Sequence, residues 1–155
     1  MSLNRVHYVR NWSHNEDKQY AVTAKLNNKS IPFLGNIGNV TSVVEEVMYW
    51  RKVNAIHKWF VDNVQNGVDD CRNYYVSIDQ LQELRSLCLA VLFKRERADE
   101  LLPCQSGCFF GDTEYDDYYF EQLEATAKVI EQLINDQAKA KKLGHSMSFE
   151  YQSSW

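Results

Sequence analysis

The first forty residues alternate apolar and polar side chains over short stretches and show no long helical period. Val6 and Tyr8 are two positions apart, and Tyr20 and Val22 repeat this spacing further along the chain. Alternate residues of a β-strand face the same side of a sheet, so this spacing predicts two short strands. Turns or loops are expected at the polar or glycine-rich runs between apolar stretches: 13–17, 27–30 and 35–39.

Three longer stretches repeat apolar residues every three or four positions, which is the spacing of one helix face. Two of them open on a capping-box pattern, in which Ser42 precedes Glu45 and Ser77 precedes Gln80 by three residues. Glycine or proline marks the end of each stretch. A final two-residue alternation at Phe149 predicts a strand in the tail. The predicted helices and the tail strand cover 42–66, 77–100, 113–143 and 147–155.

These patterns predict an α+β fold that is mainly α, in a single domain over residues 1–155. Three core helices are expected, with a small antiparallel sheet formed by strands from 1–40 and by the C-terminal tail. Hydrophobic residues make up 45% of the chain, which is enough for a core and argues against a disordered protein. Only two prolines and six glycines argue against a β-sandwich with many tight turns.

The balance of charges limits the partners that we expect. Lys and Arg number 17 and Asp and Glu number 21, so the formal net charge is −4, and bare nucleic acid is not the expected partner. No apolar run is long enough for a transmembrane helix, and no apolar segment follows the charged N-terminus as in a signal peptide. We therefore expect a cytoplasmic protein without a membrane partner, whose four cysteines are reduced thiols.

The strongest candidate for a ligand site lies in the first predicted helix. Trp50, Asn54 and His57 share one helical stripe, and Arg51 and Lys58 flank it. An aromatic wall, an amide, an imidazole and two cations together suit a base by stacking and a phosphate by charge. The alternative is that the amide and the imidazole fasten loops to the helix while both cations are solvated.

A second candidate is the loop that follows Pro103, which combines small polar residues with two adjacent aromatic residues between glycines. Glycine lets backbone N–H groups approach a ligand closely, so this loop suits binding as well as a simple crossing between helices. The tail, which ends in an aromatic residue, is included in the predicted site. The candidate ligand-binding residues outside the first helix are Gln105, Ser106, Phe109, Phe110 and Trp155.

Metal, cofactor and catalytic motifs are missing from the sequence. Cys104 and Cys108 form C-x₃-C, but no second ligand pair completes a zinc pattern, so neither a metal nor a cofactor is expected. No recognised nucleophile or phosphate-loop motif occurs. The remaining enzymatic hypothesis is a small hydrolase that uses His57 with a side chain of the run 69–71 (Asp, Asp, Cys).

A protein-binding surface is a further hypothesis, and it concerns the start of the third predicted helix. Tyrosine is enriched among the residues that dominate protein interfaces. An acidic run surrounds three tyrosines there: Tyr115, Tyr118 and Tyr119.

Several specific runs resemble a family of small phage and prophage proteins. These runs are a W-R-K-x-N-x-I-H-x-W-F-V helix, a D-D-C turn, an L-L-P-x-x-S-G-x-F-F-G loop, a Y-D-x-x-Y-F helix start and a Y-x-S-S-W tail. The match covers residues 45–155 and is poor over the first forty. The resemblance implies a phage origin but no activity. Small accessory phage proteins are often inhibitors of host defence or host enzymes, and this association sets an expectation only.

The sequence thus predicts a small phage-encoded binding protein without catalysis, in the cytoplasm of the infected cell. We expect it to counteract host defence by sequestering a nucleotide-like or otherwise phosphorylated signal. The alternatives are a protein-binding inhibitor of a host protein and the small hydrolase. A homo-oligomer is a further possibility if aromatic surfaces pair.

Overall fold

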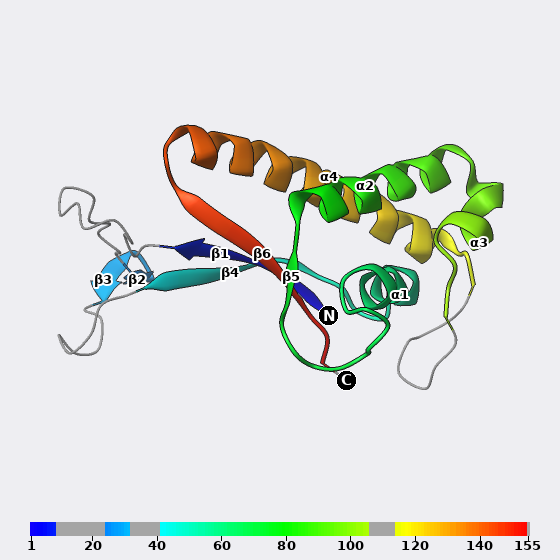
Figure 1. The fold of residues 1–155 in the computed structure, drawn as a ribbon, viewed down its shortest axis with the longest axis horizontal. Coiled ribbons are helices and arrows are strands. Elements are labelled where there is room, and N and C mark those ends of the chain that lie inside the picture. Colours follow the sequence, from blue (N-terminus) through cyan, green and yellow to red (C-terminus); the bar gives the residue numbers. More distant parts are fainter. Residues whose placement is uncertain (9–23, 32–40, 106–113, 155) are drawn as a thin grey trace.

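A computed structural model of the chain describes residues 1–8, 24–31, 41–105 and 114–154. Four antiparallel strands form the main sheet in the order β4-β1-β6-β5, and β2 and β3 form a separate hairpin (Figure 1). The strands are β1 (Ser2–Tyr8), β2 (Ala24–Leu26), β3 (Lys29–Ile31), β4 (Ser42–Tyr49), β5 (Tyr74–Val76) and β6 (Ser146–Gln152).

Two long helices lie side by side along the sheet, and a shorter helix follows β4 (Figure 1). The helices are α1 (Asn54–Asn63), α2 (Ile78–Phe93), α3 (Ala98–Leu101) and α4 (Asp117–Lys142), and a 3-10 turn (Arg95–Arg97) joins α2 to α3. The fold is therefore α+β with a small antiparallel sheet, as predicted. None of the described helices is long and apolar enough to cross a membrane.

The core lies between the sheet and the helices. Alternate residues of β1 and β6 face it, and Leu3, Phe149 and Tyr151 are almost fully buried. The Tyr151 ring stacks on Phe60 of α1, with ring centroids 4.0 Å apart. Buried residues of α2, such as Leu84, and buried residues of α4 belong to the same continuous apolar cluster.

β1 is a central strand because the two ends of the chain meet on it. It pairs with β4 on one side and with the tail strand β6 on the other, so that Arg5 lies between Glu45 and Phe149. The prediction of a small antiparallel sheet between the N-terminal part of the chain and the C-terminal tail is thereby confirmed for β1 and β6. The second predicted N-terminal strand, at Tyr20 and Val22, lies outside the described residues.

The helix predicted over 42–66 is wrong in its first part. Residues 42–49 form the strand β4, and α1 begins only at Asn54. Pairing with β1 outweighs the weak helical preference of the valine-rich run, because β-branched side chains suit a strand. Ser42 is therefore no helix cap. Lys52, in the connecting turn, has a φ of 57°, a left-handed conformation that breaks any continuous helix.

Other boundaries differ by a few residues. The helix predicted over 77–100 ends at Phe93, and the 3-10 turn and α3 replace its last part. The helix predicted over 113–143 begins at Asp117, whose predecessor Asp116 caps it. β3 and β5 were not predicted, because three-residue strands carry too little periodicity. The turn expected at 13–17 and the loop expected at 35–39 lie outside the described residues.

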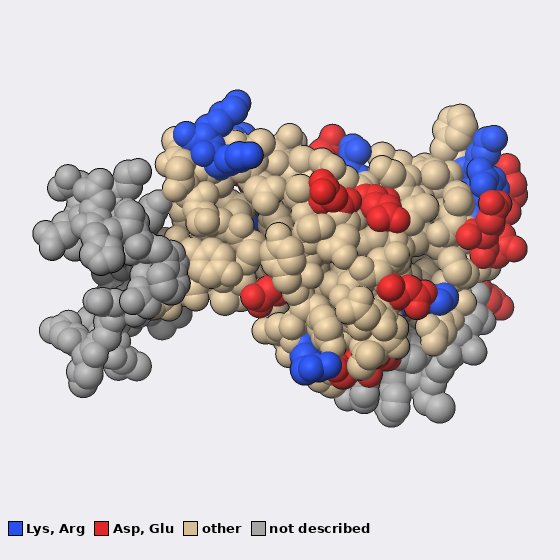
Figure 2. Space-filling model, in the orientation of Figure 1, with Lys and Arg blue, Asp and Glu red and all other residues tan. Residues whose placement is uncertain are grey.

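The charges of α4 match the helix dipole. Its first turn carries Asp117 and its last turn carries three lysines, and a group of basic side chains is visible where α4 ends (Figures 1 and 2). Carboxylates are favourable near a helix N-terminus and ammonium groups near its C-terminus. The acidic helix start is therefore stabilising by itself, whatever else it does.

The cap of α2 gives a first testable prediction. The Ser77 hydroxyl accepts a hydrogen bond from the Gln80 N–H, and the Gln80 side chain accepts one from the Ser77 N–H. We expect Ser77→Ala to lower the free energy of unfolding by about 1 kcal/mol. Ser86→Ala, inside the same helix and exposed, should change it little. Urea denaturation of both variants checks this, and equal losses would contradict the role of the cap.

The Arg5–Glu45 pair predicts a pH dependence. Arg5 donates to the Glu45 carboxylate at 2.6 and 3.0 Å, and this hydrogen bonding holds the pKa of Glu45 below its ordinary value of 4.5. A lowered pKa in the folded state contributes stability above the unfolded pKa and loses it as the pH falls further. Glu45→Gln should therefore flatten the loss of stability below pH 4.5. Glu124→Gln, on the surface of α4, should leave the profile unchanged, and pH-dependent thermal melts would show the difference.

Candidate functional site

The first predicted site residues lie in the core. Trp50, Asn54 and His57 are 1%, 3% and 2% exposed. The Trp50 indole N–H donates to Thr126 of α4 at 2.8 Å, and the ring packs against Phe60. The Trp50 indole ring is therefore packed inside the core and is not exposed for stacking on a ligand.

His57 joins three segments that are distant in sequence. Its Nδ1 lies 2.6 Å from the Tyr151 hydroxyl on β6, and its Nε2 lies 3.1 Å from the Asp69 carboxylate after α1. Burial raises the pKa of Tyr151, so its hydroxyl stays protonated beside Nδ1. The Asp69 carboxylate can only accept a hydrogen bond, so Nε2 is the donor in the second one. This arrangement fastens a loop and a strand to α1.

The same contacts bear on the hydrolase hypothesis. Of the three predicted partners, the structure brings Asp69 to His57, whereas Asp70 bonds to Arg72 at 2.7 Å. The hydroxyl beside the imidazole belongs to Tyr151, which is fully buried and stacked. A substrate does not reach that oxygen in this conformation. The contacts are those of a structural lock.

The two flanking cations do not converge on one point. Lys58 pairs with Asp62 one turn further along α1, at 2.6 Å. Arg51 is exposed in the turn before the helix, and its carbonyl accepts a hydrogen bond from the Tyr118 hydroxyl at 2.8 Å. Gln105 is exposed. The remaining predicted residues, Ser106, Phe109, Phe110 and Trp155, lie outside the described residues.

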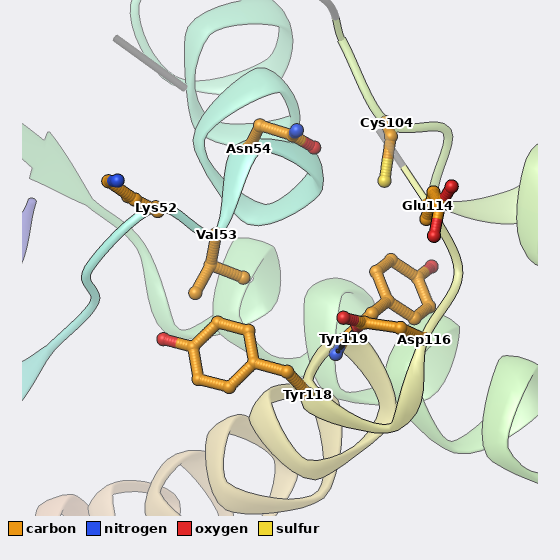
Figure 3. A pocket seen from close by; sticks show the side chains of 8 residues that line it. All are labelled: Lys52, Val53, Asn54, Cys104, Glu114, Asp116, Tyr118 and Tyr119. Carbon is orange, nitrogen blue, oxygen red and sulfur yellow. Dashed lines mark hydrogen bonds between the residues drawn. The ribbon is translucent and has the colours of Figure 1, made fainter. Parts of the chain in front are cut away.

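Asn54, one of the predicted residues, lines a pocket of about 180 Å³, and Lys58 lines a separate one. Three segments meet there: the turn into α1, the chain after α3, and the start of α4 (Figure 3). The lining residues are Lys52, Val53, Asn54, Cys104, Glu114, Asp116, Tyr118 and Tyr119.

Tyrosine hydroxyls tie these three segments together. Tyr118 binds the turn before α1 through the Arg51 carbonyl, and Tyr119 donates to the Leu102 carbonyl at 2.9 Å. The Cys104 N–H donates to the Tyr115 hydroxyl oxygen at 3.3 Å. The walls of the pocket are thus held in place by side chains that also line it.

The pocket combines groups of different chemistry. Its aromatic surface comes from Tyr118 and Tyr119, and an amide comes from Asn54 (Figure 3). Carboxylates come from Glu114 and Asp116, one oxygen of the latter accepting the Tyr119 N–H at 2.8 Å in the helix cap. Lys52 adds a cation. Such a set offers donors, acceptors and an aromatic surface to a small polar ligand.

Sequence reasoning missed Lys52, Glu114 and Asp116 as members of this site. The sequence pattern assigns Tyr118 and Tyr119 to a protein-binding surface instead. No sequence signal joins residues 52–54 to residues 114–119, because their meeting depends on hydrogen bonds from α4 to the turn before α1.

Metal ligands and one of the thiols can be assessed over the part of the chain that the structure describes. Among the residues that the structure describes, no group of three His, Cys, Asp or Glu side chains could hold a metal ion. Burial raises the pKa of Cys88 to about 12, so this thiol stays protonated and is no nucleophile at neutral pH.

The chain matches no protein-family model, no curated protein and no solved structure. The resemblance to small phage proteins therefore stays an expectation.

The His57 lock gives a prediction about stability. Tyr151→Phe keeps the stacked ring but removes the hydroxyl, and with it the buried hydrogen bond to His57 Nδ1. Such a loss costs roughly 1–3 kcal/mol of the free energy of unfolding. Tyr75→Phe, at a tyrosine that is 67% exposed, should cost close to nothing. Guanidinium denaturation compares the two, and a Tyr151→Phe variant as stable as wild type would refute the lock.

Proposed function

We propose that this chain is a non-enzymatic binding protein that holds a nucleotide-like ligand in the pocket between the starts of α1 and α4. The observation that carries the proposal is that an amide, tyrosine rings and carboxylates line one hollow, with Lys52 at its edge and its ammonium group directed away from them (Figure 3). Each matches one part of such a ligand. The proposed site therefore keeps Asn54 from the sequence prediction and replaces Trp50 and His57.

Each group has a natural counterpart on a nucleotide. Side-chain amides recognise base edges through paired hydrogen bonds, and tyrosine rings stack on the faces of bases. Carboxylates accept hydrogen bonds from ribose hydroxyls or exocyclic amines. Lys52, at an exposed turn, suits a phosphate at the mouth of the pocket.

The chemistry of the pocket favours binding over turnover. A nucleophile needs an adjacent base within hydrogen-bond reach. Among the described residues of the pocket, no His lies beside Cys104 or beside either tyrosine. Burial also raises the pKa of Tyr119, which keeps its hydroxyl protonated.

The biological role that we propose rests on the resemblance to phage proteins. A protein that sequesters a nucleotide-like or phosphorylated host signal would counteract host defence without catalysis. This role requires tight binding and a slow release of the ligand, and a pocket held by several hydrogen bonds is suited to it.

A host protein is the second candidate partner, favoured by the exposure of the pocket rim. Tyr115 and Tyr118 are 37% and 43% exposed, and the acidic residues Glu114 and Asp117 beside them are exposed as well. Exposed tyrosines with a charged surround are typical of binding hot spots. A protein inhibitor would use this rim without filling the pocket.

The test uses two variants that remove a charge while they preserve the backbone. Lys52→Asn keeps a residue type that tolerates a positive φ, and Asp116→Asn keeps a good helix cap. The probes are the four ribonucleoside 5′-monophosphates, the matching nucleosides and inorganic phosphate, measured by calorimetry. Lys52→Asn should weaken monophosphate binding about tenfold and leave nucleoside binding unchanged, because a charged hydrogen bond contributes at least about 1.5 kcal/mol.

Asp116→Asn should weaken nucleosides and monophosphates alike. Asp62→Asn, at an exposed carboxylate of α1, is the matched control and should change neither. Mass spectrometry of small molecules released from the denatured, purified protein identifies any ligand carried from the cell. A protein that releases nothing and binds none of the probes would overturn the nucleotide proposal and favour the protein partner.

A further inference from the structure

β4 is an edge strand that exposes apolar side chains. Among the described strands it lies at one end of the order, beside β1, and it is eight residues long (Figure 1). Residues 42–46 are all exposed, and two consecutive valines, Val43 and Val44, are 38% and 59% exposed. Consecutive residues of a strand face opposite sides, so apolar surface is exposed on both faces of this edge.

An edge strand presents unpaired backbone groups, and charged side chains commonly protect it from pairing. Glu45 does not act in this way, because it turns onto Arg5 at 2.6 Å. Arg5 in turn contacts Asp136 of α4 at 2.9 Å. The Glu45 charge is therefore engaged by the protein itself, and the exposed carboxylate of Glu46 is the charge that remains at this end of the edge.

The hydrogen-bond pattern indicates which backbone groups point outward. Met1 and Trp50 exchange both backbone hydrogen bonds, at 2.8 and 3.2 Å. Bonded and non-bonded pairs alternate along an antiparallel ladder. Counting from Trp50 through the bulge in the register, Glu45 directs its backbone groups to β1. Its neighbour Val44 therefore directs its N–H and C=O to the outer edge.

We propose that a second copy of this chain pairs with this edge, β4 against β4 in antiparallel orientation, about a two-fold axis through Val44. Val44 then lies opposite its own counterpart, Val43 opposite Glu45 of the second copy, and Ser42 opposite Glu46 of the second copy. The two four-stranded sheets become one continuous sheet. The pairing does not depend on what the pocket binds.

The charges select this register. An axis through Glu45 or Glu46 would place a carboxylate directly opposite its own counterpart, and like charges in such pairs are destabilising. An axis through Val43 avoids this but shortens the ladder within β4. An axis through Val47 gives a ladder of the same length without opposed carboxylates, but it centres the ladder on the bulge of β4, where the register with β1 skips residue 47. The Val44 register is thus the one that combines this length with a regular strand.

The first experiment uses the symmetry of the pairing. A residue on the axis meets its own counterpart at a Cα–Cα distance of about 5.5 Å, which suits a disulfide. Under mild oxidation Val44→Cys should form a dimer through the two introduced thiols, identified by non-reducing peptide mapping. Glu46→Cys, which lies opposite Ser42 instead, should give several-fold less of its own dimer. Equal yields for the two variants would overturn the proposal.

The second experiment needs no cysteine chemistry and does not rely on one variant. In sedimentation velocity, the wild-type protein should pass from monomer to dimer as its concentration rises. Val44→Arg places two like charges at the axis and should leave a folded monomer. Tyr75→Arg, at the opposite edge of the same sheet, should dimerise as wild type does. A wild-type protein that stays monomeric, or a Val44→Arg protein that still dimerises, would overturn the pairing, and nucleotide binding by either would leave the pocket proposal intact.

Discussion

The contact on which most of this structure depends is the packing of Tyr151 against α1. The ring stacks on Phe60, and the hydroxyl binds His57, which in turn binds Asp69. One residue of the tail strand therefore fixes the position of the first helix and of the loop that follows it. Because β6 also pairs with β1, the same contact joins both ends of the chain to the helical layer. A polar bridge inside an apolar stack specifies a single orientation, which apolar packing alone would not do.

The turn from β4 into α1 connects this core contact to the pocket. Trp50 is held by a hydrogen bond to α4, and the Arg51 carbonyl is held by Tyr118 from the same helix. Lys52, between strand and helix, adopts a left-handed conformation that reverses the chain. These hydrogen bonds from α4 to the turn before α1 therefore bring Asn54 and the start of α4 to the same pocket. The pocket thus depends on hydrogen bonds between segments that are far apart in the sequence.

The two proposals place function on opposite kinds of surface. The pocket combines an aromatic surface with polar groups of both charges, and tyrosine hydroxyls bridge the segments that form it. The β4 edge exposes valine side chains on both faces, and the Glu45 carboxylate beside them pairs with Arg5 within the protein. A small ligand with several hydrogen-bonding groups suits the pocket. The backbone of another strand, with complementary hydrogen-bonding groups, suits the β4 edge. Binding and assembly can therefore be altered separately, by different substitutions.

The sequence by itself determined the α+β class, the sheet between the two ends of the chain, and the start of α2, where Ser77 and Gln80 form a local cap. These features depend on periodicity and on contacts within a few residues. Tertiary structure decided that residues 42–49 are a strand, because the partner that stabilises them, β1, lies forty residues away. It also decided that Trp50 and His57 are core residues: a helical stripe shows which residues share a face, but not whether that face meets solvent or another helix. Asn54 reached a pocket only because the start of α4 packs beside it, and no spacing along the chain encodes that contact.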